Sequence, residues 1–285
     1  MMKKVLFGLA LAGVAVIGGK AAFADRYPEL NTRQHFPDKA TFEAHVHNQA
    51  GTRGNLVNHG GPVIHSARVV PIFWGPSWGT GGADSATAQH VIGFFGQFGT
   101  SSHFATITQY YDAAGSIQTS NLGNTNWFDS STPPTNVTDS AVQNEVIKYL
   151  TVGGGTFDAS TIYEVFLPPG SYSSDGGGTS CGGPALQYCA YHGHFSWSGH
   201  DVKYSSMPYP SCGGCQSAGF TAAQNIDHFS CHETREAVTD EDLNAWYDRR
   251  GNEADDKCAW SPAPFLDSGY GYQYEWSNAA GGCVR

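Results

Sequence analysis

The chain has 285 residues, a formal net charge of −10 and no basic run, which excludes nucleic acid and an anionic membrane surface as partners. Only 14% of its residues are charged, whereas 13% are aromatic and 36 residues are glycine. This composition is typical of a loop-rich globular protein and excludes a disordered or coiled-coil chain.

Residues 1–24 have the three parts of a secretory signal peptide. Two lysines provide the positive start, an apolar run covers residues 5–17, and residues 22–24 (AFA) form a small-residue cleavage site. The apolar run is too short to cross a bilayer as a helix, so an uncleaved membrane anchor is the less favoured alternative. We therefore expect a secreted protein, extracellular or periplasmic, whose mature chain begins near Asp25.

Residues 25–61 are polar and lack a periodic pattern, and we expect them to form an extended N-terminal arm or a short pro-segment. Residues 62–285 are long enough to form one large domain. At the start of this domain, β-branched and aromatic residues over 62–75 predict a core strand, in which Pro71 marks an edge or a bulge.

The remaining elements combine helices and strands without strict alternation. Apolar residues at helical spacing predict helices over 85–98, 102–111, 140–150 and 221–238, the third of them capped by Asp139. A long loop is expected over 113–138. Extended runs predict a strand over 160–170, a hairpin over 189–197 and 200–210, and a last strand over 270–284. This order predicts a mixed α/β (α+β) fold and not a doubly wound one.

All cysteines lie between residues 181 and 283, roughly the C-terminal third, and in an exported protein they are expected to pair. Local spacing predicts the disulfides Cys181–Cys189, Cys212–Cys215 and Cys258–Cys283. Cys231 is left over inside a helix, where a small buried thiol fits. The C-G-G-C spacing at 212–215 also permits half of a zinc knuckle or a redox pair. No second C-x-x-C completes a knuckle, so a tight-loop disulfide is favoured.

The stretch FSCHETREAVTD, residues 229–240, contains the pattern H-E-x-x-E, which differs by one residue from the zinc-protease signature H-E-x-x-H. Residues four apart on a helix point to the same side, so His232 and Glu236 can bind one cation. Glu233 lies beside them, where it can take a proton from an attacking water. The alternative is a solvated acidic helix face with a packed core histidine.

Two ligands do not hold zinc, so a third is expected from the acidic residues downstream. The candidates are Asp240, Glu253 and Asp256. A peptidase also needs a group that stabilises the developing oxyanion. The candidates for this role are Tyr191, His192 and His194, each of which has packing or a surface position as the alternative.

Several stretches between about residues 58 and 284 together resemble a set of exported bacterial zinc metallopeptidase-like proteins, which are distantly similar to the plant EXORDIUM, or phosphate-induced, proteins. The stretches are HGGPVIHSARVVPIFWG, KYSSMPYPSCGGC, HETREAVTD, AWYDRRGNEADDKCAW and YEWSNAAGGCV. Members of the family read S-H-E-x-x-E-A-x-T-D-P, then W-Y-D, then G-x-E-x-x-D-x-C. This chain departs from the pattern with Cys231 for the serine and Glu241 for the proline.

The resemblance implies a single zincin-like domain whose active-site helix carries the motif, and hydrolysis of peptide bonds in a protein or peptide substrate with Zn²⁺. Carried over to this sequence, the family pattern covers His232, Glu233, Glu236, Asp240, Glu253, Asp256 and Cys258. The plant relatives have largely lost the H-E pair, so resemblance to them implies the fold and not catalysis.

Two other functions remain open from the sequence. One is a non-catalytic secreted wall, matrix or glycan-binding protein whose acidic residues hold a structural Ca²⁺, because carboxylates are ligands that calcium prefers. The other is hydrolysis of a glycan by two carboxylates, Glu233 with Glu236 or Glu253, which leaves His232 without a role. Bound zinc would favour the peptidase, and calcium or no metal would favour the alternatives.

Overall fold

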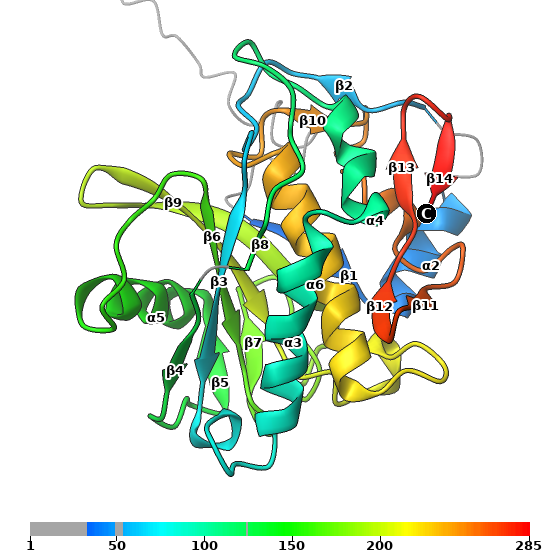
Figure 1. Cartoon of the computed structure of the whole chain (residues 1–285). Helices are drawn as coiled ribbons and strands as arrows, with labels where there is room; N and C mark the ends of the chain where they lie inside the picture. The colour runs from blue at the N-terminus through cyan, green and yellow to red at the C-terminus, as the bar shows by residue number, and fades with distance from the viewer. Residues whose placement is uncertain (1–32, 49–53, 124) are drawn as a thin grey trace, which may run out of the picture.

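The computed structural model describes residues 33–48, 54–123 and 125–285 (Figure 1). The expected signal peptide, residues 1–24, lies outside the described residues. A mixed sheet of six strands forms the centre of the molecule, and its strand order is β1-β8-β9-β6-β3-β4. Its strands are β1 (Arg33–Pro37), β8 (Tyr188–Trp197), β9 (His200–Met207), β6 (Thr161–Phe166), β3 (Arg68–Trp74) and β4 (Trp127–Asp129). The predicted mixed α/β class with a mixed sheet is confirmed.

One half of the sheet is antiparallel and the other half is parallel. β1 and β9 both run antiparallel to β8, whereas β9, β6, β3 and β4 run parallel to one another. Ser198 and Gly199 connect β8 to β9 with φ angles of 51° and 79°. Two consecutive positive φ angles match the right-handed twist of the flanking strands, which explains the tight hairpin. The predicted hairpin is therefore confirmed.

Helices cover both faces of the sheet (Figure 1). α3 (Ser85–Phe98) and α6 (Ala222–Thr239) pack side by side on one face, and α5 (Asp139–Thr151) packs on the other. A separate apolar cluster fills the space on each side of the sheet. α6 begins at a capping box in which Thr221 and Gln224 satisfy each other's backbone N–H groups. The helices predicted over 85–98 and 221–238 are confirmed.

Three local predictions need correction. Thr138, not Asp139, caps α5, because the Thr138 hydroxyl accepts the hydrogen bond from the Ala141 backbone N–H. The helix predicted over 102–111 is only one turn, α4 (Ser102–Ala105), followed by the 3₁₀ turn η3 (Thr106–Gln109). Pro71 lies inside β3 and not at an edge of the sheet. The sheet tolerates it there because pairing toward β4 begins only at the next residue.

Short elements complete the fold, among them a helix after β1 and four two-stranded sheets. The strand expected over 270–284 is divided between two hairpins, and the loop expected over 113–138 contains β4 and β5. The elements are α2 (Lys39–Asn48), β2 (Val57–Asn58), η2 (Pro76–Trp78), β5 (Asn136–Thr138), β7 (Tyr172–Ser174), η4 (Gly213–Cys215), β10 (Trp246–Tyr247), η5 (Asp256–Cys258), β11 (Phe265–Asp267), β12 (Tyr270–Tyr272), β13 (Glu275–Ser277) and β14 (Gly282–Val284).

Disulfides join Cys181 to Cys212, Cys189 to Cys215 and Cys258 to Cys283. The two local pairings predicted for the first four cysteines are therefore wrong. η4 packs against β8, so both cysteines of the C-G-G-C turn meet partners from the 181–189 segment instead of each other. The third pairing is confirmed. Cys231 is a free, buried thiol in α6, as predicted.

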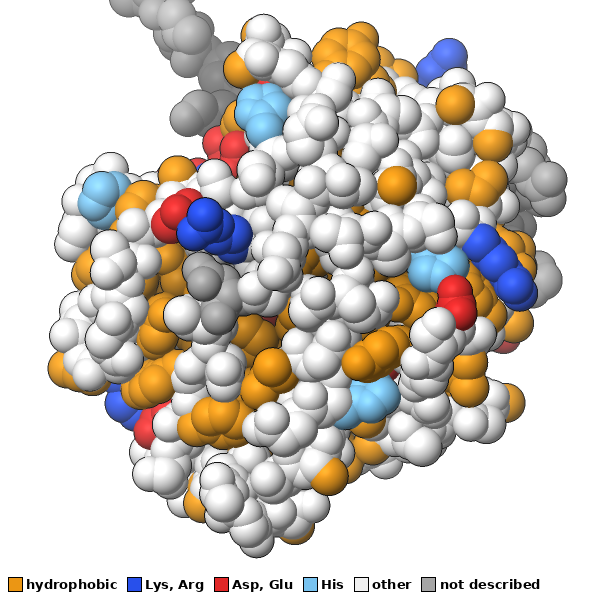
Figure 2. Space-filling model, viewed as in Figure 1, with side chains coloured by type: hydrophobic (Ala, Val, Ile, Leu, Met, Phe, Trp, Pro, Cys, Tyr) orange, Lys and Arg blue, Asp and Glu red, His pale blue; other side chains and the backbone are white. Residues whose placement is uncertain are grey.

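Figure 2 shows that acidic and basic side chains on one face are few and lie scattered among apolar and uncharged groups. Within the part of the chain that the structure describes, none of the helices is long and apolar enough to cross a membrane.

Candidate metal centre

The helix α6 that carries the H-E-x-x-E motif lies inside the protein. It packs between the strands β8 and β9 on one side and α3 and β12 on the others (Figure 1). His232, Glu233 and Glu236 are each 0% exposed. The motif is therefore not a solvated acidic helix face, and its charged groups need partners inside the protein.

The imidazole of His232 is fixed in one orientation by Gln273. The amide nitrogen of Gln273 donates to the Asp255 carbonyl and carboxylate at 2.9 and 2.7 Å, so its Oε1 is an acceptor. Nδ1 of His232 lies 3.2 Å from that Oε1 and therefore carries the proton. Its Nε2 faces Glu236 Oε2 at 3.0 Å and Asp256 Oδ1 at 3.7 Å. Burial lowers the pKa of His232, which keeps the ring neutral.

A second buried imidazole, that of His192 on β8, reaches the same cluster. Its Nδ1 lies 2.9 Å from Glu233 Oε2, and its Nε2 lies 3.5 Å from Glu253 Oε2. Burial lowers the pKa of His192 to about 3, so this ring is neutral as well. The sequence had indicated His192 only as an oxyanion-binding group, whereas the structure places it among the candidate metal ligands.

Three acidic side chains lie against one another beside the two imidazoles. The Glu253 carboxyl contacts those of Glu236 and Asp240, and among the residues that the structure describes neither of its oxygens has a hydrogen-bond donor. Burial raises the pKa of Glu236 to about 8 and that of Asp240 to about 6. Burial and then the charges of Glu236 and Asp240 raise the pKa of Glu253. Without a cation, carboxyls this close cannot all ionise.

The only arginine in α6 does not neutralise this cluster. Arg235 pairs with Asp255 and, at 2.8 Å, with Glu275, so its single positive charge is already shared by those two acids. Four other acids of the cluster form ion pairs, namely Glu233, Glu236, Glu253 and Asp256. In the described structure these ion pairs involve only the two imidazoles. The buried negative charge therefore exceeds the positive charge around it. A bound cation would balance it.

Two overlapping groups of ligand atoms exist in the cluster. His232 groups with Glu233 and Glu236, and His192 groups with Glu236 and Glu253, with all ligand atoms of each group within 4.8 Å of one another. Nε2 of each histidine, Oε2 of Glu236 and both oxygens of Glu253 are buried and lack hydrogen-bond partners in the described structure. Imidazole nitrogen together with carboxylate is a donor set that fits zinc, whereas calcium takes oxygen ligands.

The other expected site residues lie at different distances from this cluster. Asp256 joins it through His232 and through its backbone N–H, which donates to Glu236 Oε1 at 2.8 Å. Asp240 reaches Glu253 only, and its Oδ1 accepts two backbone N–H groups of the loop that follows α6. The structure thus brings together His232, Glu233, Glu236, Glu253, Asp256 and His192.

Two expected oxyanion groups lie elsewhere. Tyr191 points to the opposite face of the sheet, because neighbours along a strand alternate, and its hydroxyl donates to Asp139 at 3.0 Å. His194 lies 2.9 Å from Asp201 in a partly exposed group that also contains Asp242. The ammonium of Lys203 already pairs with both of these acids, which supplies the positive charge there.

Strand β1 pairs with the outer edge of β8 and covers the cluster there. Gln34 lies opposite His192 in the sheet, and its amide donates to Asp256 Oδ2 at 3.1 Å. The Phe36 ring stacks on the His232 ring with centroids 4.3 Å apart, and its backbone N–H donates to Glu233. The segment expected to be an arm or a pro-segment therefore supplies direct contacts to the motif. The sequence carried no signal for Gln34 or Gln273, because each is a single amide without a motif.

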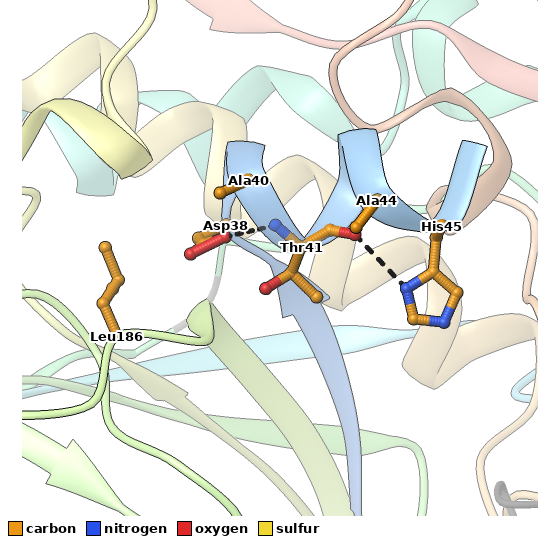
Figure 3. A pocket seen from close by; sticks show the side chains of 6 residues that line it. All are labelled: Asp38, Ala40, Thr41, Ala44, His45 and Leu186. Atoms are coloured by element: carbon orange, nitrogen blue, oxygen red, sulfur yellow. Dashed lines mark hydrogen bonds between the residues drawn. The ribbon is translucent and has the colours of Figure 1, made fainter. Parts of the chain in front are cut away.

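A shallow hollow of about 430 Å³ lies between α2 and Leu186 (Figure 3). Its acidic residue, Asp38, already accepts the backbone N–H of Thr41 at 2.7 Å and so caps α2. The hollow does not include the residues of the buried cluster.

The chain matches no family model, no curated protein and no solved structure. Its function is therefore inferred from the geometry of the buried cluster.

Proposed function

We propose that this protein is a secreted zinc-dependent peptidase whose metal is held by His232 and Glu236. The observation that carries the proposal is that His232 Nε2 and Glu236 Oε2 are fully buried, lie 3.0 Å apart and lack a hydrogen-bond partner in the described structure. Glu233 lies next to them on the same helix. Asp256 is the third ligand that the geometry favours, because its Oδ1 lies 3.7 Å from the same Nε2. When bound, zinc lowers the pKa of a water molecule and polarises a carbonyl group.

Glu233 is the proposed general base. Its carboxylate takes the proton of the attacking water and passes it to the nitrogen of the leaving amine. Nδ1 of His192 lies 2.9 Å from Glu233 Oε2, and this contact holds the carboxyl group in place. Burial and the charge of Glu236 raise the pKa of Glu233. A cation bound at Glu236 would offset the second of these causes, so that Glu233 can ionise and accept a proton.

Substrate reaches this cluster only after β1 has moved. Gln34 and Phe36 fill the space over Asp256 and His232, and Phe36 is 0% exposed. We therefore include in the proposal that the segment of β1 acts as a pro-segment. An extended peptide of the substrate can then pair with the edge of β8 that β1 occupies, because a free sheet edge accepts a strand.

The same burial favours a second candidate function. A metal ion that the protein covers on every side is also typical of a structural site, and structural zinc contributes directly to the stability of a fold. In that case the protein is a non-catalytic secreted wall, matrix or glycan-binding protein. The two functions require the same metal ligands. The peptidase needs Glu233 as its general base, whereas a structural metal site does not.

The test compares the protein with its Glu233→Gln variant. Peptidase activity on casein is measured before and after limited proteolysis of the N-terminal segment, together with zinc content. The peptidase proposal predicts activity that a chelator abolishes and that falls by about 10²–10⁴-fold in Glu233→Gln while zinc is retained. Zinc in both proteins without any cleavage would contradict the peptidase and support the structural role.

A further inference from the structure

The two imidazoles of the cluster have the same arrangement. In each ring Nδ1 has a partner, which is Gln273 Oε1 for His232 and Glu233 Oε2 for His192. In each ring Nε2 is buried and lacks a hydrogen-bond partner in the described structure. A histidine that binds a metal typically donates its other N–H to a carboxylate or carbonyl in this way. Both rings are therefore oriented as ligands.

The two imidazoles belong to different groups of ligand atoms. His232 belongs to the group with Glu233 and Glu236, whereas His192 belongs to the group with Glu236 and Glu253. Atoms that bind one zinc ion at about 2.0–2.2 Å cannot lie more than about 4.4 Å apart. Glu236 is the residue that the two groups share. The geometry thus offers two neighbouring cation positions with a common carboxylate.

The charge of the cluster agrees with two cations. Four of the carboxyls are at most 1% exposed, and the Asp256 side chain is 11% exposed; the four are Glu233, Glu236, Asp240 and Glu253. With one divalent ion, about three of the five carboxyls would have to keep a proton, because an uncompensated buried charge is costly in a protein interior. Two divalent ions leave about one such carboxyl, and the partly exposed Asp256 can be solvated.

We propose that the protein binds a second divalent transition-metal ion through His192, Glu236 and Glu253, next to the ion at His232, so that Glu236 bridges a two-metal centre. This inference rests on the proposed zinc at His232. The imidazole of His192 selects zinc or a similar metal over calcium and magnesium, which take oxygen ligands. In a two-metal site the paired ions stabilise both the attacking and the leaving atoms of a hydrolysis.

The test is the number of zinc ions per chain in the intact secreted protein after zinc loading and dialysis, measured by elemental analysis. We expect about two ions in the wild type and about one in His192→Ala and in Glu253→Gln. Glu253→Gln keeps the shape of the side chain, so it remains informative if His192→Ala does not fold. The control is His200→Ala, at the exposed start of β9, which should keep about two ions.

The outcomes separate this inference from the proposed function. One ion in the wild type that persists in His192→Ala would overturn the second site and leave the first intact. One ion that is lost in His192→Ala would mean that both histidines bind the same ion, which also overturns the inference. Absence of metal from the wild type would overturn both proposals.

Discussion

Gln273 Oε1 lies 3.2 Å from Nδ1 of His232, and this contact fixes which nitrogen of the ring is free to bind a metal. The amide of Gln273 is held in turn by Asp255. Replacing Gln273 with Leu keeps the volume but removes the acceptor. We predict that zinc binding weakens by about 10–100-fold, as for other residues that orient a metal ligand.

Competition with a chromophoric chelator measures this change in affinity. The matched control is Gln109→Leu, whose amide accepts and donates hydrogen bonds at Ser277 and Ala279, outside the cluster. Equal zinc affinity of Gln273→Leu and the wild type would show that His232 does not need this partner.

The contact between Phe36 and His232 predicts that β1 controls access to the cluster. Phe36 is 0% exposed, so Phe36→Ala should lower the free energy of unfolding by about 3–5 kcal/mol. The loosened strand should also let a chelator remove the metal faster. The rate of zinc release and the denaturant midpoint measure the two effects. An unchanged rate of release in a destabilised variant would refute the role of β1 as a cover.

A pH dependence of stability is predicted on the other face of the sheet, at Glu145 in α5. Burial, and then the hydrogen bond with Asp129, raise the pKa of Glu145 to about 8. Between about pH 4.5 and 8 the unfolded chain has lost this proton and the folded chain has kept it, so stability falls as pH rises through this window. The loss of folding free energy should be about 1–2 kcal/mol. This is less than the full shift of the Glu145 pKa implies, because the neighbouring Lys148 side chain is 37% exposed and water screens its charge.

Chemical denaturation of the wild type and Glu145→Gln at several pH values checks this prediction. The variant has no carboxyl to titrate, so its stability relative to the wild type should increase from pH 5 to pH 8 and then level off. A constant difference across this range would contradict the raised pKa.

The disulfide pattern gives a prediction that can be tested without an activity assay. Peptide mapping without reduction should recover Cys181 linked to Cys212 and Cys189 linked to Cys215. Cys231 should resist thiol reagents in the folded protein, because burial raises its pKa to about 12 and the thiol is enclosed. Recovery of a Cys212–Cys215 peptide would contradict the described packing of η4 on β8.

The features that the sequence predicted correctly depend on local patterns. The helix α6 could be predicted because its apolar spacing lies within one segment, and the β8–β9 hairpin because its turn is two residues long. The pair His232 and Glu236 could be recognised because they are four apart on one helix. These relationships need no knowledge of how distant segments pack.

The rest of the site depends on long-range packing. His192 meets Glu233 only because β8 lies over α6, and Gln34 meets Asp256 only because β1 adds to the edge of β8. The wrong disulfide pairs have the same origin, since closeness along the chain did not predict that η4 would pack on β8. Gln273 has no pattern at all, and only its position beside His232 gives it a role.

The central claim is that His232 and Glu236 hold a metal ion. Anomalous diffraction from a crystal of the zinc-loaded protein, recorded on both sides of the zinc absorption edge, tests it most directly. The expected peak lies about 2.0–2.1 Å from His232 Nε2 and within bonding distance of Glu236. No peak at these atoms, or a peak only at the exposed group of His194 and Asp201, would contradict it.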